Sequence, residues 1–392
     1  MILQKHWQLN LSILWLGSFI TELGNALTLP FLPLYIATLG NYHGWTLNIL
    51  SSIAFAVTYL AKTIVSPIWG RLADRHGRKL MCLRASGVMT LTIFANAWVP
   101  NVWWLIIFRA LQGAFSGYIN NAQALIADAT PAAHEGHALG TLATGGVTGT
   151  LLGPLIGGLI ADQVGYRATF IVAAIGMLVV FISTALFVTE DFVPQPTKSF
   201  QRSRTPISSL LLVIFFIVLT VQAASTTIQP IVSLFVHQLS PHSRNLALLS
   251  GLVTAAPGLA TLLAAPRLGK LVDRIGAIRV IYWGLAGAAI ILIPMLWLTN
   301  TSQLVIGRFC FGLTDAAIIP AYQTLMTQLT NKNEFGQIFS YSQSFQAFGN
   351  VIGPVLGGVL ASVYGFRSIF ILTLMMELGC LVALRVTHRT AN

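Results

Sequence analysis

Charged residues are scarce in this chain. They make up 8% of its 392 residues, whereas soluble domains average about 25%. So few charges cannot cover a water-facing surface, which excludes an ordinary soluble enzyme and a disordered tail. Hydrophobic residues account for 55% of the chain. This composition predicts a polytopic membrane protein.

Cysteine is rarer still, with three residues in the chain. Cys82, Cys310 and Cys380 lie far apart in apolar segments, which excludes a disulfide framework and a metal cluster, so no metal site is expected. A Gly-x4-Gly-Lys-Ser/Thr phosphate loop is also missing from the sequence, which disfavours an ATP-driven pump. No nucleophile and base occur together at one depth, so the chain is not expected to be an enzyme.

Long apolar runs dominate the sequence. A helix needs about 20 residues to cross the hydrocarbon core of a bilayer, and twelve runs of that length leave no room for a soluble domain. We interpret the first as an uncleaved span rather than a signal peptide. The runs lie near residues 11–36, 47–69, 80–99, 102–126, 138–160, 168–188, 208–235, 247–266, 280–298, 303–329, 338–361 and 368–387.

The basic residues indicate how these spans are oriented. With both termini cytoplasmic, sixteen Lys and Arg residues fall on the inside and three on the outside. Basic loops resist translocation, so this bias predicts a multi-pass protein of the cell (plasma or inner) membrane with both termini inside. The positive charge is spread over many short loops instead of one face, which excludes nucleic acid as a partner.

The two halves of the chain repeat each other at an offset of 199 or 200 residues. The longest polar segment lies between the sixth and seventh runs, and it predicts an N-terminal bundle over 1–188, a cytoplasmic linker over 189–207 and a C-terminal bundle over 208–392. The fold class expected is all-α, with twelve transmembrane helices in two six-helix bundles. The matching segments are 70–77 with 269–276, 109–113 with 308–312, and 149–158 with 349–358.

Three of these segments resemble signatures of the major facilitator superfamily: the loop 70–79, the segment that begins at Arg109, and the glycine pattern over 140–158. The glycine pattern resembles the motif of the twelve-span drug:proton antiporters, and the resemblance covers essentially the whole chain. It implies a bacterial multidrug efflux transporter. Such a transporter works by alternating access, needs no cofactor beyond the proton gradient and functions as a monomer.

The loop after the second span is the expected cytoplasmic gate. The resemblance implies that Asp74 faces the N-terminus of span eleven, whose dipole favours an anion, and that Arg78 bridges Asp74 to Asp128. A role in topology alone is the alternative. In the second copy Ala277 and Ile278 replace Arg78 and Lys79, so a one-sided lock is expected. The predicted gate residues are Gly70, Asp74, Arg75, Gly77, Arg78, Asp128, Asp273 and Arg274.

Small residues recur every four positions in the fifth span. They form one bare stripe, which lets two helix backbones approach closely, and a proline bends the helix there. The resemblance implies that this stripe seals the outer half of the interface with the other bundle; close packing within one bundle is the alternative. The motif comprises Gly140, Gly149, Gly153, Pro154, Gly157 and Gly158.

Three acids fall at the centres of predicted spans: Glu22, Asp315 and Glu377. A charge at mid-bilayer costs roughly 3 kcal/mol or more, so such groups are functional by default. No histidine lies at that depth, so a proton-coupling group is expected to be a carboxylate. The resemblance places spans one, four, seven and ten around the central cavity, which favours Glu22 and Asp315 over Glu377 in span twelve.

Two arginines accompany these acids in the predicted coupling set. Arg308 lies seven residues before Asp315, about 10 Å along the same helix face, so a structural Arg–Asp arrangement also remains open. Arg109 has no acid on its own helix and must find a partner elsewhere, such as carbonyl groups of span one. The resemblance implies that Arg109 stabilises proton movement.

Polar and aromatic residues at helical spacing complete the predicted substrate cavity. Aromatic rings could stack on a lipophilic cation, and hydrogen bonding between helices is the alternative for each polar residue. The candidates are Asn25, Phe115, Tyr118, Gln222, Gln229, Tyr322, Gln343, Gln346 and Asn350.

The sequence thus predicts a secondary transporter that exports amphipathic, lipophilic drugs in exchange for protons. A proton-coupled sugar or metabolite exporter of the same fold is the first alternative. A non-transporting membrane receptor is the alternative from another class, and the lack of an extramembrane domain argues against it.

Overall fold

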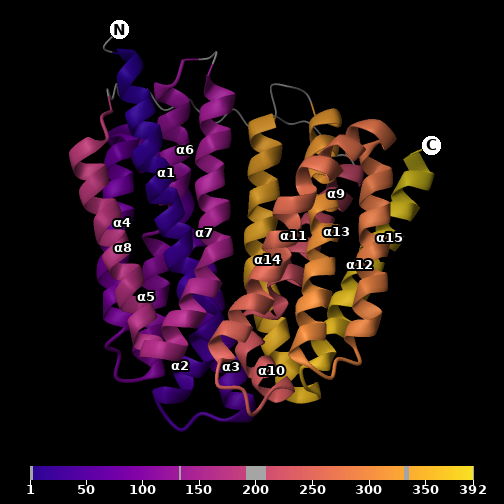
Figure 1. The fold of residues 1–392 in the computed structure, drawn as a ribbon. Coiled ribbons are helices and arrows are strands. Elements are labelled where there is room, and N and C mark those ends of the chain that lie inside the picture. Colours follow the sequence, from indigo (N-terminus) through magenta and orange to yellow (C-terminus); the bar gives the residue numbers. More distant parts are fainter. Residues whose placement is uncertain (1–2, 132–133, 191–208, 331–334, 392) are drawn as a thin grey trace. The chain divides into compact units, whose positions relative to one another are not determined.

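The computed structural model describes residues 3–131, 134–190, 209–330 and 335–391, and these are almost entirely helical, with no strand among them (Figure 1). This confirms the predicted all-α class. The first half contains α1 Leu3–Thr28, η1 Leu29–Phe31, α2 Leu32–Thr38, α3 Gly44–His76, α4 Arg78–Asn96, α5 Val102–Ala114, α6 Tyr118–Ala129, α7 Glu135–Val164 and α8 Tyr166–Phe187. The second half contains α9 Ser209–Thr227, η2 Gln229–Ile231, α10 Val232–Leu239, α11 Leu246–Ile275, α12 Ala277–Met295, α13 Thr301–Gln328, α14 Phe335–Tyr364 and α15 Arg367–Ala391.

Eleven segments of the described chain are long and apolar enough to cross a membrane. The predicted span near 80–99 corresponds to α4, which is not among the eleven. Arg78, Lys79 and Arg84 in its first two turns lower its mean hydropathy. Of the predicted linker 189–207, the structure describes only Thr189 and Glu190, and residues 191–207 lie outside the described residues.

Proline and glycine break three of the predicted continuous spans. In the first span, Pro30 and Pro33 follow the end of α1, and in the seventh, Pro230 follows the end of α9, because proline lacks the N–H that continues a helix. The fourth span breaks between α5 and α6, where Gly117 adopts a left-handed conformation with φ of 117°. Its counterpart α13 runs unbroken.

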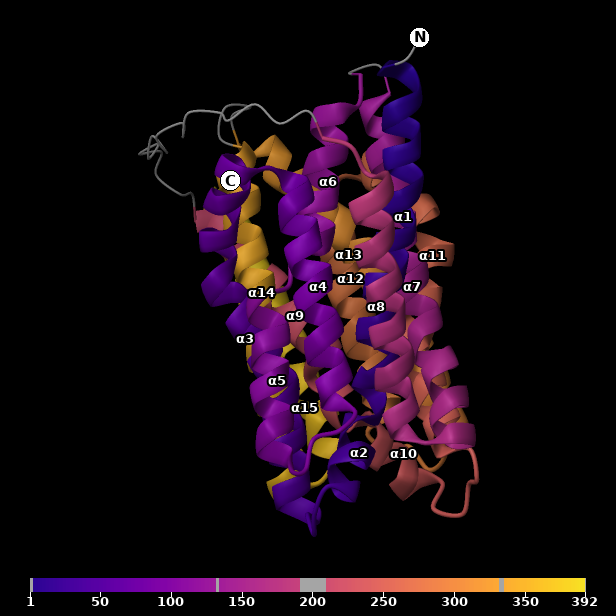
Figure 2. The same cartoon turned by 90° about the vertical axis from the view of Figure 1, so that its left-hand side faces the viewer.

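The chain folds into two compact units. Unit 1 comprises Met1–Asn41, Val57–Phe200 and Arg244–Gly251, and unit 2 comprises Tyr42–Ala56, Gln201–Ser243 and Leu252–Asn392. The helices α3 and α11 therefore each contribute to both units. Inside unit 1, α1 packs on α7 and α8, and α4 packs on α8 (Figure 2). Inside unit 2, α9 packs on α14 and α15 in the matching way.

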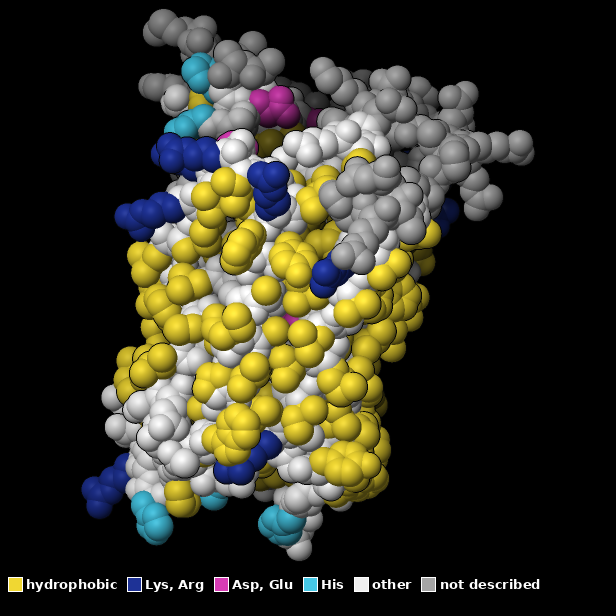
Figure 3. Space-filling model, turned by 90° about the vertical axis from the view of Figure 1, so that its right-hand side faces the viewer, with side chains coloured by type: hydrophobic (Ala, Val, Ile, Leu, Met, Phe, Trp, Pro, Cys, Tyr) yellow, Lys and Arg dark blue, Asp and Glu magenta, His cyan; other side chains and the backbone are white. Residues whose placement is uncertain are grey.

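The outer surface of unit 2 is strongly apolar. Figure 3 shows one face on which hydrophobic side chains form a broad area, with Lys and Arg mostly toward its ends. Large side chains such as Trp283, Ile290 and Met375 are more than half exposed on this unit. An apolar surface of this extent is not stable in water, and it fits the hydrocarbon core of a bilayer.

Candidate functional site

Glu22, the predicted coupling acid of unit 1, lies on α1 where that helix packs most closely on α7. A Cβ atom built on Gly146 would lie 3.7 Å from Cγ of Glu22, and one built on Gly149 would lie 3.1 Å from its Cβ. Thr150 of α7 lies beside it, with its hydroxyl donating to the Gly146 carbonyl over 3.0 Å, and the charge of Lys62 on α3 acts on Glu22. The half-buried carboxyl group therefore has a nearby cation and a hydroxyl, which make its charged form tolerable at this depth.

Arg109 is enclosed a short way from this acid. Its side chain is 2% exposed, and Tyr59 of α3 interacts electrostatically with both Arg109 and Glu22. On the same helix as Arg109, Gln112 donates a hydrogen bond of 3.2 Å from Nε2 to Oδ1 of Asn25. The structure thus brings Glu22, Asn25 and Arg109 into one polar cluster, to which Tyr59 and Lys62 add side chains that the sequence did not assign.

Unit 2 has an uncharged pair at the matching place. Gln222 lies 200 residues after Glu22, and Asn350 lies 200 residues after Thr150. Nε2 of Gln222 donates to Oδ1 of Asn350 over 2.9 Å. These two side chains are therefore hydrogen-bonded between helices, which is the stated alternative to contact with a ligand. The repeat is preserved in position, while the charge is present only in unit 1.

The acid of unit 2 lies instead on α13. Oγ of Ser225 donates to Oδ2 of Asp315 over 2.6 Å, and Nη2 of Arg308 donates to the Ser225 carbonyl over 3.4 Å. Ser225 therefore connects the two charged groups, which are both buried. Carbonyl groups of span one are the partners expected for Arg109. In unit 2 the matching helix α9 supplies such a carbonyl group, and it accepts a bond from Arg308.

Several predicted cavity residues are packing residues in this structure. Tyr118 is buried in the core of unit 1 with Leu14, Cys82 and Val180, and its hydroxyl lies 2.9 Å from that of Thr184. It begins α6, directly after the left-handed residue Gly117. A side chain enclosed in this way cannot line a cavity, which corrects the prediction.

Other predicted cavity residues need similar corrections. Tyr322 is buried in the core of unit 2 and accepts a hydrogen bond of 3.0 Å from Gln346. Gln229 is not on the same helix as Gln222, because α9 ends at Thr227 and Gln229 begins the short helix η2. Phe115 is half-buried and packs on Trp69 with ring centroids 5.4 Å apart. Gln343 is exposed on α14.

The glycine stripe of α7 packs against α1 inside unit 1. Cβ atoms built on Gly149, Gly153 and Gly157 would lie within 3 Å of α1 atoms, including N of Leu23 and O of Leu27. These three glycines therefore pack closely within one bundle, which is the stated alternative for the stripe. Pro154 lies inside the helix between them, and Gly140 faces open space. In unit 2, Gly349, Gly353 and Gly357 pack on α9 in the same manner.

Gly158 departs from this pattern. It contacts Ala247 and Leu248 at the start of α11. One turn later, the carboxylate of Asp162 accepts hydrogen bonds from the backbone N–H groups of the same two residues, over 3.1 and 2.9 Å. An anion at a helix N-terminus is stabilised by the helix dipole. Asp162 is not among the predicted site residues, although an acid at the end of an apolar helix indicates that it can cap a neighbouring helix.

The loop 70–79 is held by acids of unit 1. Nη2 of Arg78 lies 2.7 Å from Oδ1 of Asp74, so one half of the predicted bridge is present. Asp128 does not complete it, because Asp128 is exposed on α6 and forms no ion pair with the described residues. Glu190 acts instead: its two carboxylate oxygens accept from the backbone N–H groups of Arg78 and Lys79, each over 2.7 Å. Glu190 lies shortly after α8, which ends at Phe187 and packs on α4, so its side chain reaches the N-terminus of α4.

Glycine is required at the turn in both copies of this loop. Gly77 has a φ of 94° and Gly276 a φ of 90°, values that side chains with a Cβ rarely adopt. The other predicted gate residues, Gly70, Arg75, Asp273 and Arg274, are exposed. The structure therefore gives the two glycines a backbone role and leaves these four at the surface.

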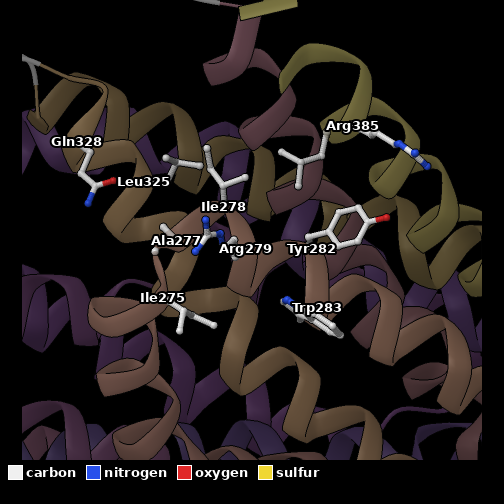
Figure 4. A pocket seen from close by; sticks show the side chains of 11 residues that line it. Ile275, Ala277, Ile278, Arg279, Tyr282, Trp283, Leu325, Gln328 and Arg385 are labelled. Carbon is white, nitrogen blue, oxygen red and sulfur yellow. The ribbon is translucent and has the colours of Figure 1, made fainter. Parts of the chain in front are cut away.

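Unit 2 has a cavity beside its copy of the loop. It measures about 550 Å³, and Figure 4 shows its lining, with Arg279, Tyr282 and Trp283 from α12, Gln328 from α13 and Arg385 from α15. Ala277 and Ile278 stand where unit 1 has Arg78 and Lys79. The described residues provide no acid cap at the N-terminus of α12, in contrast to Glu190 in unit 1.

Paired helical units with buried charges inside apolar spans define a membrane carrier and not an enzyme. The chain belongs to the Major Facilitator Superfamily, whose model matches residues 14–251 and 210–392. The two matches reflect the internal repeat. The resemblance predicted from the loop, the Arg109 segment and the glycine pattern is therefore confirmed.

Curated relatives match over nearly the whole chain. The chain is 43% identical over 378 residues to the multidrug resistance protein MdtG of Rahnella sp. (strain Y9602), with 95% of this chain and 92% of that protein covered. The MdtG protein of Salmonella paratyphi B (strain ATCC BAA-1250 / SPB7) is 42% identical over 373 residues, with 94% and 92% covered.

Solved structures show the same fold. A bacterial homologue of the human lysosomal transporter Spinster, in an inward-facing and occupied conformation, superposes with a TM-score of 0.83 at 14% identity, over 97% of this chain and 96% of that one. The nucleoside transporter NupG gives a TM-score of 0.78 at 11% identity, over 97% and 99%. At these identities the likeness concerns the fold alone.

Proposed function

We propose that this protein exports amphipathic, lipophilic drugs from the cell in exchange for protons, by alternating access between two bundles. The observation that carries this proposal is Glu22, a half-buried acid at the centre of a membrane-spanning segment, beside Lys62 and Thr150. A carboxyl group at this depth is costly when charged and unpaired. It is therefore suited to bind a proton in one state and to lose it in another.

The relatives supply the substrate class. They are named multidrug resistance proteins and match more than nine-tenths of this chain, so the same class of cargo is proposed here. Asn25 and Gln112 beside Glu22, and Gln222, Asn350 and the exposed Gln343 in unit 2, are the polar side chains proposed to meet it. The names of these relatives favour lipophilic drugs over sugars as the cargo.

We further propose that the bundles comprise residues 1–188 and 208–392, and that the protein works as a monomer in the plasma or inner membrane with both termini inside. In this arrangement the loop held by Asp74, Arg78 and Glu190 is the cytoplasmic gate. Because Asp74 is half-exposed and paired with Arg78, we expect D74N to slow turnover without changing the range of substrates. Selective loss of one drug would contradict a gate at this loop.

Transport by the purified chain in vesicles tests the proposal. Vesicles are loaded with a cationic dye or with a sugar, and release is followed with and without an imposed pH gradient. We expect the gradient to accelerate dye movement, to leave the sugar unaffected, and to lose its effect when an uncoupler is added. Dye movement that ignores the gradient would refute proton coupling. Gradient-driven sugar movement would favour the sugar-exporter alternative instead.

A further inference from the structure

Glu377 is the most enclosed acid of the described chain. It lies in α15, its side chain is 0% exposed, and neither carboxylate oxygen has a hydrogen-bond partner. The helix packs on α9, α12 and α14. An ionised carboxylate without a partner costs several kcal/mol in such surroundings. The side chain is therefore stable here only as the neutral acid, with a proton bound.

Among the described residues, no cation acts on Glu377 to offset its charge. The charge that acts on it belongs to Asp315, which is a second acid. The buried Arg308 of α13 lines a small cavity with Thr373, one turn before Glu377, and it bonds to the Ser225 carbonyl. On the helix of Glu377 the nearest titratable group is the buried thiol of Cys380, and α9 carries no titratable side chain. The titratable groups of α12 and α14 are Arg279, Tyr282, Tyr341 and Tyr364, all of which are exposed.

Asp315 is also incompletely satisfied. Its Oδ2 accepts from Ser225, whereas its Oδ1 is buried and has no partner. Unit 2 therefore holds two acids that influence each other, with three buried carboxyl oxygens between them that accept no hydrogen bond. Like charges in such proximity disfavour simultaneous ionisation, so the pair loses its protons one after the other.

The repeat shows that the fold does not need this acid. Met177 of α8 lies 200 residues before Glu377 and is also fully buried, so methionine fills the equivalent position of unit 1. Ser116 likewise matches Asp315 at an offset of 199 residues. Both acids are additions to unit 2 at positions where the repeat accepts uncharged side chains.

We propose that Glu377 is a proton-binding site of the transporter and forms a functional pair with Asp315. In the closed unit the Glu377 carboxyl group keeps its O–H bond. When movement of α9 against α15 admits water, this bond breaks, the proton passes to water, and the carboxylate remains until the next proton binds. The inference rests on the proton-coupled export proposed above, and it adds one proton to the number moved in each cycle.

Proton stoichiometry of the purified chain in vesicles tests the pair. The ratio of protons to dye is obtained from the pH gradient that just balances an opposing dye gradient. We expect E377Q and E377M to lower this ratio by one while both still bind dye. E377M is the second variant because Met177 shows that methionine fits the matching site. A wild-type chain that moves dye without protons would refute the proposed function as a whole. Proton-coupled dye movement with an unchanged ratio in both variants would overturn the role of Glu377 alone.

Infrared spectroscopy supplies a readout on the wild-type chain that does not depend on the variants. A protonated carboxyl group has its own C=O stretching band. We expect such a band at neutral pH, a decrease in it when the dye binds, and a smaller decrease in E377Q, in which only Glu22 and Asp315 can contribute. A spectrum in which dye binding changes no carboxyl band would contradict the proposal.

Discussion

The two units share one repeat but place their charges differently. In unit 1 the acid is on the first helix, at Glu22, and its matching residue in unit 2 is Gln222. In unit 2 the acids are on α13 and α15, at Asp315 and Glu377, where unit 1 has Ser116 and Met177. The backbone packing, by contrast, is nearly identical, since Gly149 and Gly349 contact the same turn of their partner helices.

This difference shows which features the fold requires and which the function adds. Close contact of α7 with α1 and of α14 with α9 needs glycine in both units, because a side chain would collide with the backbone. Burying an acid costs free energy, and each buried acid occurs in only one of the two units. Helix packing therefore does not account for these acids. The loop 70–79 and its copy in unit 2 follow the same division, since both need glycine at the turn but only unit 1 has Glu190 as a cap among the described residues.

The largest effect is expected when Glu22 receives the residue of its counterpart. E22Q should reduce gradient-driven dye efflux to the rate seen without a gradient, because the amide cannot bind and release a proton at neutral pH. Efflux from vesicles measures this. E135Q, which changes an acid at the start of α7, serves as the control and should retain efflux. A normal efflux rate in E22Q would remove Glu22 from the mechanism.

The glycine stripes are expected to give the largest effects on stability. G149A and G349A each place a Cβ within 3 Å of a neighbouring helix, and such overpacking costs about 1–3 kcal/mol. Thermal unfolding of the purified protein measures the loss. The matched control is G140A, where the added methyl group meets open space. Equal unfolding temperatures for all three variants would mean that the stripes are not close contacts.

A moderate effect is expected at the hydroxyl that joins Arg308 and Asp315. S225A removes the 2.6 Å bond to Asp315 and leaves that carboxyl group without a side-chain donor among the described residues, which costs about 1–3 kcal/mol. N25A, the matching change in unit 1, removes a bond between neutral groups, worth about 1 kcal/mol. The unfolding temperature should therefore fall further in S225A. The reverse order would contradict the stronger polar coupling assigned to unit 2.

The smallest effect is expected at the cap of α4. E190Q keeps the shape of the side chain but removes the charge that faces two backbone N–H groups, which is worth about 0.3–1 kcal/mol. A small fall in unfolding temperature that lessens at high salt is expected. E135Q, which changes an acid that takes no part in this cap, provides the comparison of unfolding temperatures. An unchanged unfolding temperature at low salt would show that the cap contributes nothing.

Some of the candidate site followed from sequence spacing, and some did not. Glu22, Asp315 and the arginines were found because a charge within an apolar run is conspicuous. Glu190 and Asp162 were missed because each lies at a helix end, where acids are common and only a neighbouring helix N-terminus gives them a role. Tyr118 lies in the core of unit 1 and Gln229 lies beyond the end of α9, which residue spacing alone did not indicate.

The sequence by itself determined the membrane-spanning helices, the internal repeat and the family, because these depend on composition and on local periodicity. Only the tertiary structure decided which helix the glycine stripes contact, which carbonyl Arg308 bonds, and that Glu377 has no partner. These facts depend on groups far apart in the chain. The packing of the helices sets how closely these groups approach each other, and no local sequence pattern predicts that packing.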